Sequence, residues 1–489
     1  MEKISKKISG EHPLYQEKIL QFGEGNFLRA FVDWQIDVLN KKTDFKGSVV
    51  VVQPRGSEKI ERLNEQDGLF TLYLQGIKEG KAVNEHMIVN SISRGIDLVK
   101  DYDKYVDLAG SEELRFIISN ATEAGVYLET TDRLEDRPQK SFPGKLTAFL
   151  FHRFQVFKGD YQKGCVIIPC ELIEENGAKL RDIVLQFASI WNLGEAFVEW
   201  ILHANTFCNS LVDRIVPGFP KDTIDEITAE LGYQDDLLVV GEQYHQWVIE
   251  GPQWIKTEFP IDQVGLNTFF VDDLTPYRVQ KVRILNGVHT AMTPVAYLSG
   301  VETVAEAMED DTTGQFIKEL TFEEIIPTLN MPTEELRAFA NDVLNRFKNP
   351  YIKHYLLSIS LNSLSKFKTR NLPALLDYVE KKQELPRRMV FSLSALLIFY
   401  KGKRGGEMIP LEDDSSVLEL FKASWKSVAE DTMKVEELVE TILGNQDIWG
   451  MDLNGISGLT KLVAEYVHQI EESGIKPSLE AMMKEQSVK

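Results

Sequence analysis

Segment 18–53 constrains the fold more than any other part of the chain, because its apolar pattern changes period twice. Residues 18–22 (Lys-Ile-Leu-Gln-Phe) and 48–53 (Ser-Val-Val-Val-Val-Gln) are short apolar runs with the length of buried strands. Between them, apolar side chains recur at helical spacing from Leu28 to Leu39. Since parallel strands need a crossover connection, this order predicts a βαβ unit in a parallel sheet.

The turn between the first predicted strand and the helix is Gly23-Glu24-Gly25-Asn26-Phe27. Glycines in this context let the backbone approach a pyrophosphate at the helix N-terminus, so we expect a dinucleotide site formed by Phe22, Gly23, Gly25 and Asn26. The G-x-G-x-x-G fingerprint is incomplete, because Leu28 stands at its third glycine position. A tight turn without a ligand would show the same two glycines.

The end of the second predicted strand bears on the choice of cofactor. The acid that would hold the ribose hydroxyls of NAD is replaced by Gln53-Pro54-Arg55. An arginine there could accept the 2′-phosphate of NADP. This segment therefore leaves NAD and NADP both open.

Two further buried strands are predicted, at 115–120 and 165–172. The first leads into a polar loop, Ala121-Thr122-Glu123-Ala124-Gly125. Open α/β sheets bind ligands at the carboxyl ends of their strands, so Asn120 and Thr122 are expected to line the same nucleotide site.

The chain from about Pro276 onward shows helical periodicity instead. Turn signals separate the predicted helices, which cover 333–347, 351–365, 371–382, 387–401, 415–430 and 455–472. The sequence therefore predicts an α/β, Rossmann-like N-terminal domain over residues 1–274, followed by a mostly α-helical C-terminal domain over residues 275–489 that carries substrate and catalytic groups.

Composition narrows the classes of partner. A formal net charge of −21 over 489 residues argues against nucleic acid and anionic membranes. The three cysteines lack metal-ligand spacing and are too few for a disulfide framework. The N-terminus has no apolar core of a signal peptide, and the longest apolar run, Met389 to Tyr400, is too short to span a bilayer. We therefore expect a cytoplasmic protein with no bound metal.

The segment from Lys281 to His289 places an amine, an amide (Asn286) and an imidazole within nine residues. At about 100° per residue of an α-helix, His289 lies about 80° and Asn286 about 140° round from Lys281. A carbonyl under reduction needs a proton donor and hydrogen bonds to the developing oxyanion, which this trio can supply. The alternative is an ordinary amphipathic helix.

These motifs resemble one family, the polyol-specific long-chain dehydrogenases or mannitol dehydrogenase family. Its K-x-x-x-x-N-x-x-H signature is met by Lys281, Asn286 and His289, and its G-x-G-x-F-x-R block by residues 23–29. The N-S-x-V-D-R-I segment is met by residues 209–215, and weaker blocks occur at 141–147 and 242–249. The resemblance runs in order from about residue 18 to about residue 375.

The resemblance implies metal-independent hydride transfer between a nicotinamide, NAD being favoured, and a secondary alcohol or ketone. It implies that Lys281 is the general acid/base, that Asn286 and Asn209 hold the reacting oxygen, and that His289 orients it. Phe27 and Arg29 would line the nucleotide site together with the two glycines. It also implies a monomer or a weak homo-oligomer.

Within the family, residues 21–31 and 281–290 are most similar to members that interconvert tagaturonate and altronate in hexuronate breakdown. Three residues before the lysine, members acting on neutral polyols tend to carry an acid, whereas this chain has Arg278. We expect Arg278, helped by Lys366 and Arg370, to bind a substrate carboxylate. A solvated helix end would explain the same cations.

Three functional alternatives stay open at this stage. One is reduction of fructuronate, and another is oxidation of a neutral polyol such as mannitol. The third is a nucleotide-binding regulatory protein without catalysis, which would have no need of a proton donor.

Overall fold

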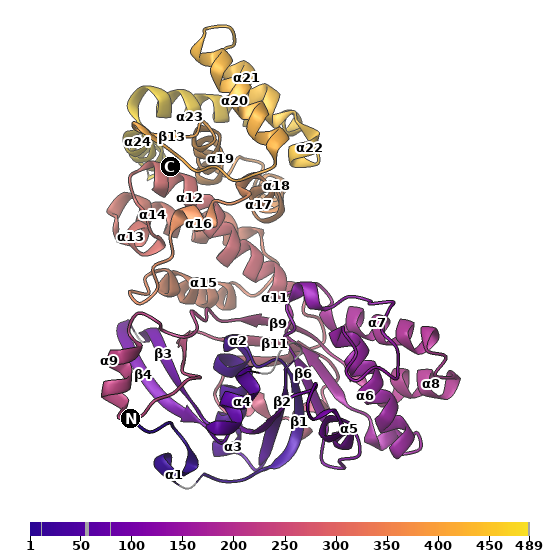
Figure 1. Cartoon of the computed structure of the whole chain (residues 1–489). Coiled ribbons are helices and arrows are strands. Elements are labelled where there is room, and N and C mark those ends of the chain that lie inside the picture. Colours follow the sequence, from indigo (N-terminus) through magenta and orange to yellow (C-terminus); the bar gives the residue numbers. More distant parts are fainter. Residues whose placement is uncertain (11, 54–57, 79, 488–489) are drawn as a thin grey trace. The chain divides into compact units, whose positions relative to one another are not determined.

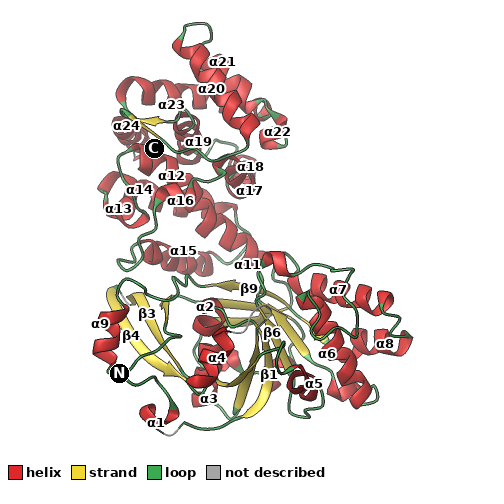
Figure 2. Cartoon of the chain, viewed as in Figure 1, coloured by secondary structure: helices red, strands yellow, loops and turns green. Residues whose placement is uncertain are grey.

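The computed structural model describes residues 1–10, 12–53, 58–78 and 80–487. The chain forms two compact units, one from Met1–Lys78 with Val83–Leu274 and the other from Thr275–Lys489 with Glu79–Ala82. Strands dominate the centre of the first unit, whereas the second is built of helices (Figures 1 and 2). Among the described residues, no helix combines the length and the apolar character needed to cross a membrane.

A six-stranded parallel sheet organises the first unit, with strand order β5-β2-β1-β6-β7-β8. Its strands are β1 (Gln16–Phe22), β2 (Gly47–Val52), β5 (Ile92–Ile96), β6 (Phe116–Ser119), β7 (Val166–Pro169) and β8 (Thr206–Phe207). Counted within this sheet, the order is 3-2-1-4-5-6, which is the arrangement of doubly wound dinucleotide-binding domains. The strand order reverses between β1 and β6, so a ligand site is expected where these two strands end.

Both faces of this sheet are buried, and successive residues of a strand face opposite cores. Ile19, Val49 and Ile118 belong to one apolar cluster, whereas Leu20 and Val50 belong to the other. Helices supplying the first cluster are α2 (Asn26–Leu28), η1 (Arg29–Asp33), α3 (Trp34–Lys42) and α4 (Glu58–Glu65). Those supplying the second are α5 (Tyr102–Leu108), α6 (Phe142–Val156), α7 (Asn176–Ile190) and α8 (Glu195–Ala204). This double burial explains why the strands are continuous apolar runs in the sequence.

Two smaller sheets complete the unit, and the sequence patterns did not indicate them. One has the order β10-β3-β4 and the other the order β12-β11-β9. Their strands are β3 (Phe70–Lys78), β4 (Lys81–Val89), β9 (Asn209–Asp213), β10 (Val239–Glu242), β11 (Gln246–Glu250) and β12 (Thr268–Val271). β4 is exposed or half-buried over almost its whole length, so it lacks the apolar alternation that marks a strand. The unit also contains α1 (Lys6–Ser9), η2 (Glu123–Gly125), η3 (Tyr161–Lys163), α9 (Ile224–Leu231), α10 (Ile255–Glu258) and η4 (Ile261–Gln263).

In its described residues the second unit is mostly helical, with a small hairpin of β13 (Lys403–Arg404) and β14 (Glu407–Met408). Its first half comprises α11 (Thr275–Gln280), η5 (Lys281–Gly287), α12 (Val288–Leu298), α13 (Val304–Glu309), α14 (Asp311–Glu319), η6 (Leu320–Ile325), η7 (Ile326–Thr328), α15 (Thr333–Phe347) and α16 (Leu356–Ile359). Then follow α17 (Ser363–Arg370), α18 (Leu372–Lys382), α19 (Arg387–Phe399), α20 (Ser415–Ala429), α21 (Val435–Leu443), α22 (Gln446–Trp449), η8 (Leu453–Gly455), α23 (Leu459–Ser473) and α24 (Ile475–Ser487).

Five of the six predicted helices of this unit form close to their expected bounds, but the single helix predicted over 351–365 is wrong. The structure has α16 and α17 there, separated at Asn362, whose φ of 53° is left-handed. Helix α16 has already ended at Ile359, and Asn362, a residue type that tolerates this conformation, directly precedes α17. Apolar periodicity continues across such a break and therefore does not reveal it.

Helix α19 is the core of the second unit, since every residue from Arg388 to Phe399 is buried. Its first turn is capped by the buried carboxylate of Glu324, which accepts hydrogen bonds from the backbone N–H of Arg388 (2.9 Å) and of Met389 (2.8 Å). The Arg388 guanidinium, with 5% of its side chain exposed, also donates to Glu319 (3.0 Å). These buried charges stabilise the fold only as a complete set.

We expect Arg388→Ala to lower the free energy of unfolding by about 3–5 kcal/mol, because it leaves buried carboxylates without their cation. The neighbouring Arg387 is a matched control, since its ion pair with Glu485 is solvent-exposed (37% and 59% of the two side chains). Arg387→Ala should cost less than about 1 kcal/mol. Urea unfolding followed by circular dichroism measures both, and equal losses would contradict the assignment.

Candidate nucleotide site and catalytic motif

The glycine turn after β1 contains two glycines with different physical requirements. Gly23 has a φ of +124°, and a Cβ there would lie 2.9 Å from Leu28 and 3.1 Å from the Asn120 carbonyl oxygen. The fold itself therefore demands a glycine at position 23. Gly25 has a φ of −66°, and a Cβ there would meet nothing within 4 Å. The glycine at 25 thus leaves space that the protein does not fill, as a backbone approached by a phosphate requires.

Arg29 supports this turn from inside the protein. Its side chain is 4% exposed, and its guanidinium donates to the Glu24 carbonyl oxygen, to Asn26 Oδ1 (2.9 Å) and to the Leu237 carbonyl oxygen (3.2 Å). Nearby, burial raises the pKa of Asp33 to about 7. Arg29 therefore orders the turn, and Asn26, which is exposed, is held at the helix N-terminus.

The two phenylalanines of the predicted site are packing residues in the structure. Phe22 is fully buried, with its ring centroid 4.9 Å from that of Phe142. Phe27 is half-buried and stacks on Phe31 at 5.0 Å. The Phe22 side chain faces the core, so only its backbone is available to a ligand.

The loop after β6 lies where the strand order of the sheet reverses. The Asn120 amide donates to the Cys170 carbonyl oxygen (3.0 Å). Thr122 has φ 68° and ψ 160°, a region that β-branched residues rarely occupy. The buried carboxylate of Glu171 accepts hydrogen bonds from the Ala121 N–H (2.8 Å) and the Ser119 hydroxyl (3.1 Å), and burial raises its pKa. Sequence reasoning missed Glu171, although a carboxylate at the end of an apolar strand was a usable signal.

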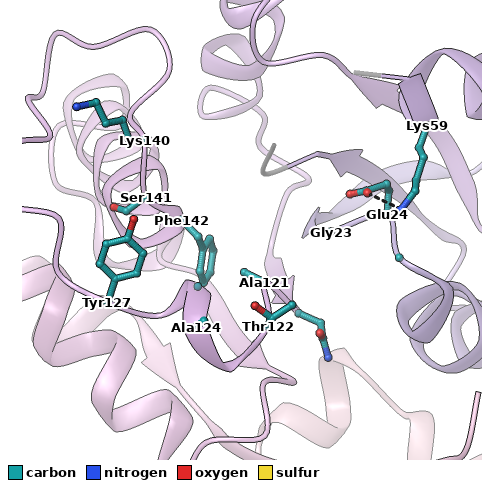
Figure 3. Close-up of a pocket in the computed structure, with 13 residues that line it drawn as sticks. Gly23, Glu24, Lys59, Ala121, Thr122, Ala124, Tyr127, Lys140, Ser141 and Phe142 are labelled. Carbon is teal, nitrogen blue, oxygen red and sulfur yellow. Dashed lines mark hydrogen bonds and ion pairs between the residues drawn. The ribbon is translucent and has the colours of Figure 1, made fainter. Parts of the chain in front are cut away.

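A pocket of about 350 Å³ opens where β1 and β6 end. One side is formed by the glycine turn and Lys59, whose ammonium lies 3.2 Å from Glu24. Ala121 and Thr122 lie between this side and the opposite one, which carries Tyr127 and the start of α6 (Figure 3). The volume is within the range of ligand sites. Gly23, Gly25, Asn120 and Thr122 all line it, so the fold brings these four predicted residues together.

The start of α6 explains the Ser-Phe-Pro-Gly block of the sequence. Ser141 caps the helix by accepting from the Gly144 N–H (3.0 Å), and its hydroxyl donates to Asp132 (2.6 Å). A Cβ at Gly144 would lie 2.5 Å from that carboxylate, so the position needs glycine. This rigid turn places Lys140, Ser141 and Phe142 on the pocket, none of which the sequence had indicated as site residues.

Asn209 has a structural duty in addition to its predicted role. Its Oδ1 accepts hydrogen bonds from the backbone N–H groups of Gly177 (3.0 Å) and Ala178 (3.1 Å) at the start of α7. Its Nδ2 donates to Glu250 (2.7 Å). Since an amide nitrogen carries two hydrogens, at most one N–H of Asn209 remains for another acceptor.

Lys281 and Asn286 lie on a π-helical segment, η5, and not on the α-helix that the sequence predicted. In a π-helix the hydrogen bonds join residues five apart, so positions i and i+5 are one turn apart on the same side. Lys281 and Asn286 have this spacing, whereas an α-helix would separate them by about 140°. The π turn therefore places the amine and the amide on one face.

His289 follows on α12, where aromatic side chains hold its ring. The imidazole stacks on Phe347 at 4.2 Å with an interplanar angle of 24°, and His354 meets it edge-on at 5.0 Å. Burial lowers the pKa of His354. Phe347 and His354 come from distant parts of the sequence, and no local signal could have found them.

The predicted carboxylate-binding cations occupy different environments. Arg370 reaches the motif helix, donating to the Thr290 hydroxyl (3.2 Å), and burial lowers its pKa. Lys366 donates to the Ile359 carbonyl oxygen (2.8 Å). Arg278 is half-buried on α11, one turn before Lys281. Gln53 is described, but Pro54 and Arg55 lie outside the described residues.

The described residues also bear on metal and disulfide chemistry. Within those residues, no group of three or more His, Cys, Asp or Glu side chains could hold a metal ion. Cys165, Cys170 and Cys208 are buried free thiols, and burial raises the pKa of each.

The strand order defines the first unit as a Rossmann-type domain. Two family models match the chain, the mannitol dehydrogenase Rossmann domain over residues 17–263 and the mannitol dehydrogenase C-terminal domain over residues 273–471. The chain belongs to the mannitol dehydrogenase family.

Curated relatives agree with this membership, and two solved structures share the fold. The chain is 63% identical to the altronate oxidoreductase of Bacillus subtilis over 480 residues, which is 98% of each chain. It is 46% identical to that of Yersinia enterocolitica over 471 residues, 96% of this chain and 97% of the relative. A Pseudomonas fluorescens mannitol 2-dehydrogenase, solved with NAD and D-mannitol, is 22% identical with a TM-score of 0.66, covering 99% of this chain and 100% of that one. A D-sorbitol dehydrogenase structure is also 22% identical, with a TM-score of 0.79, covering 98% of this chain and 100% of that one.

We expect Gly25→Ala to keep the melting temperature of the protein and to weaken NADH binding, because its methyl group enters space that only a ligand would fill. Gly23→Ala is the contrasting variant and should lower both, since its Cβ collides with protein atoms in a left-handed backbone. Thermal unfolding and fluorescence titration with NADH separate the two effects. Unchanged NADH affinity in Gly25→Ala would refute this placement of the cofactor.

Proposed function

We propose that this protein is an NAD-dependent oxidoreductase that interconverts D-tagaturonate and D-altronate. The structural observation that carries the proposal is the π turn with Lys281 and Asn286 on one face. The relatives at 63% and 46% identity over nearly the full length, both altronate oxidoreductases, supply the substrate pair.

The pocket at the strand-order reversal is the proposed cofactor site. Gly23 and Gly25 bring the backbone close to a pyrophosphate, and the space above Gly25 is open. Asn120 and the strained Thr122 lie on the same pocket. When bound, the nicotinamide supplies the hydride that converts the ketone carbon to a secondary alcohol.

The side chains of the Lys281–His289 motif then transfer the proton and stabilise the negative charge on the substrate oxygen. Lys281 donates a proton to the ketone oxygen during reduction and takes it back during oxidation. Asn286 donates an amide N–H to the same oxygen as negative charge develops, and the other N–H of the Asn209 amide is proposed as a second donor. His289, fixed by Phe347, orients the substrate. This chemistry needs no metal ion.

A substrate carboxylate calls for a cation, and Arg278 is the proposed partner. It lies one turn before Lys281, at a position where an acid would repel a uronate. Arg370 and Lys366 are proposed to add positive charge. We also propose that the enzyme acts in the cytoplasm, where its buried thiols stay reduced, as a monomer or weak homo-oligomer.

Absorbance at the NADH wavelength tests the activity, with tagaturonate, fructuronate and fructose each offered with NADH and with NADPH. We expect oxidation of NADH with tagaturonate, and its loss in Lys281→Ala with NADH binding retained, because the proton donor is removed. Turnover of fructuronate or fructose alone would replace the substrate and keep the reaction class. NADH binding without turnover of any substrate would favour a regulatory protein.

Arg278→Glu tests the specificity. We expect KM for tagaturonate to rise by at least about tenfold, since a charge-assisted hydrogen bond contributes about 1.5–3 kcal/mol. The dissociation constant of NADH should not change. Arg278→Gln is the milder control, because it removes the positive charge without reversing it. Its KM for tagaturonate should lie between those of the wild type and Arg278→Glu. Equal weakening of substrate and cofactor binding would remove Arg278 from the substrate site.

A further inference from the structure

Asn371 lies at the junction of α17 and α18 and is fully buried. An asparagine in this place commonly caps the following helix with its side chain. Here it makes no cap hydrogen bond. Its Nδ2 instead donates to the carbonyl oxygen of Gly287, the last residue of η5, at 2.9 Å.

The neighbouring carbonyl of the π segment is held in a similar way. The Thr290 hydroxyl donates to the Asn286 carbonyl oxygen (2.9 Å) and accepts from the Arg370 guanidinium (3.2 Å). Two consecutive carbonyl groups therefore receive side-chain hydrogen bonds, that of Asn286 from Thr290, which Arg370 contacts, and that of Gly287 from Asn371. A π-helix distorts the regular hydrogen-bond ladder, so external donors of this kind stabilise it.

The same segment is fastened from α18 as well. Arg283, in the middle of η5, lies 2.6 Å from Asp377 of α18 and donates to the Thr328 hydroxyl (3.0 Å). The segment η5 is thus contacted by Asn371, which directly precedes α18, and by Asp377 within that helix. These contacts fix the segment that carries Lys281 and Asn286.

The carbonyl oxygen of the Asn371 side chain indicates that this arrangement lowers the stability of the fold. Its Oδ1 is buried and finds no hydrogen-bond partner among the described residues. A buried acceptor without a partner destabilises the fold by about 1–3 kcal/mol, and such groups are few in native proteins. An apolar side chain would avoid that cost but could not donate to Gly287.

We infer that Asn371 is a positioning residue for catalysis, whose amide holds η5 in its π-helical form and so keeps Lys281 and Asn286 on one face. The expected effect on kcat rests on the proposed function, whereas the expected effect on the conformation of η5 does not. Asn371 acts through the backbone of Gly287 and does not contact the substrate.

Three variants test this role. Asn371→Ala removes the amide, and Asn371→Asp keeps its shape but replaces the donor with an acceptor. Asn205→Ala is the matched control, since Asn205 is also a buried amide that bonds two backbone groups, those of Cys165 and Trp200, in the first unit. We expect both Asn371 variants to lose kcat by about 10²-fold, as a displacement of about 1 Å can cause. KM for tagaturonate and NADH affinity should change far less, and Asn205→Ala should keep its kcat.

Hydrogen–deuterium exchange supplies a readout that needs no substrate. In the Asn371 variants, the backbone amides of residues 281–291 should exchange faster than in the wild type. The exchange rates of the amides in α19 and α23 should not change. Full kcat in Asn371→Ala, or unaltered exchange over 281–291, would overturn the inference. If the wild type fails to turn over tagaturonate, the proposed function fails, and the exchange measurement still decides whether Asn371 holds the segment.

Discussion

The reversal of strand order between β1 and β6 is the constraint on which the nucleotide site depends. Parallel strands end at the same edge of the sheet, and the chain leaves β1 and β6 toward helices that contribute to opposite faces. The loops after these strands diverge and leave a pocket between them. Hydrogen bonds from Gly23 to β2 (3.0 Å) and from Asn120 to β1 (3.0 Å) then join both loops to the sheet.

Both candidate sites contain backbone that departs from regular geometry, and buried polar groups support it. In the first unit, Thr122 has a rare conformation in a loop whose neighbouring residue, Ala121, is held by Glu171, and the π segment η1 follows the glycine turn. In the second unit, η5 is π-helical and Asn371 holds its last carbonyl. Irregular backbone of this kind persists only where its surroundings determine it, and it concentrates at functional sites.

Local patterns were sufficient for the elements with a strong period. The strands at 18–22 and 48–53 form as β1 and β2, and α15 occupies the predicted range 333–347. The small sheets were not predicted, because β4 is mostly exposed and its neighbour β3 pairs with β10, which is distant in the sequence. The break at Asn362 escaped it as well, since one left-handed residue does not disturb the apolar period.

For the site, the sequence by itself determined the chemical groups: two glycines in a strand-to-helix turn, and an amine, an amide and an imidazole at fixed spacing. It did not determine that the two glycines differ, since only the structure shows protein atoms packed against Gly23 and open space above Gly25. Only the tertiary structure decided which groups act together. The stacking of Phe347 on His289 and the support of Ala121 by Glu171 join residues far apart in the chain, and the π-helical segment η5 receives a hydrogen bond from the distant Asn371. A periodic pattern reports burial along one segment, whereas these contacts depend on packing between segments.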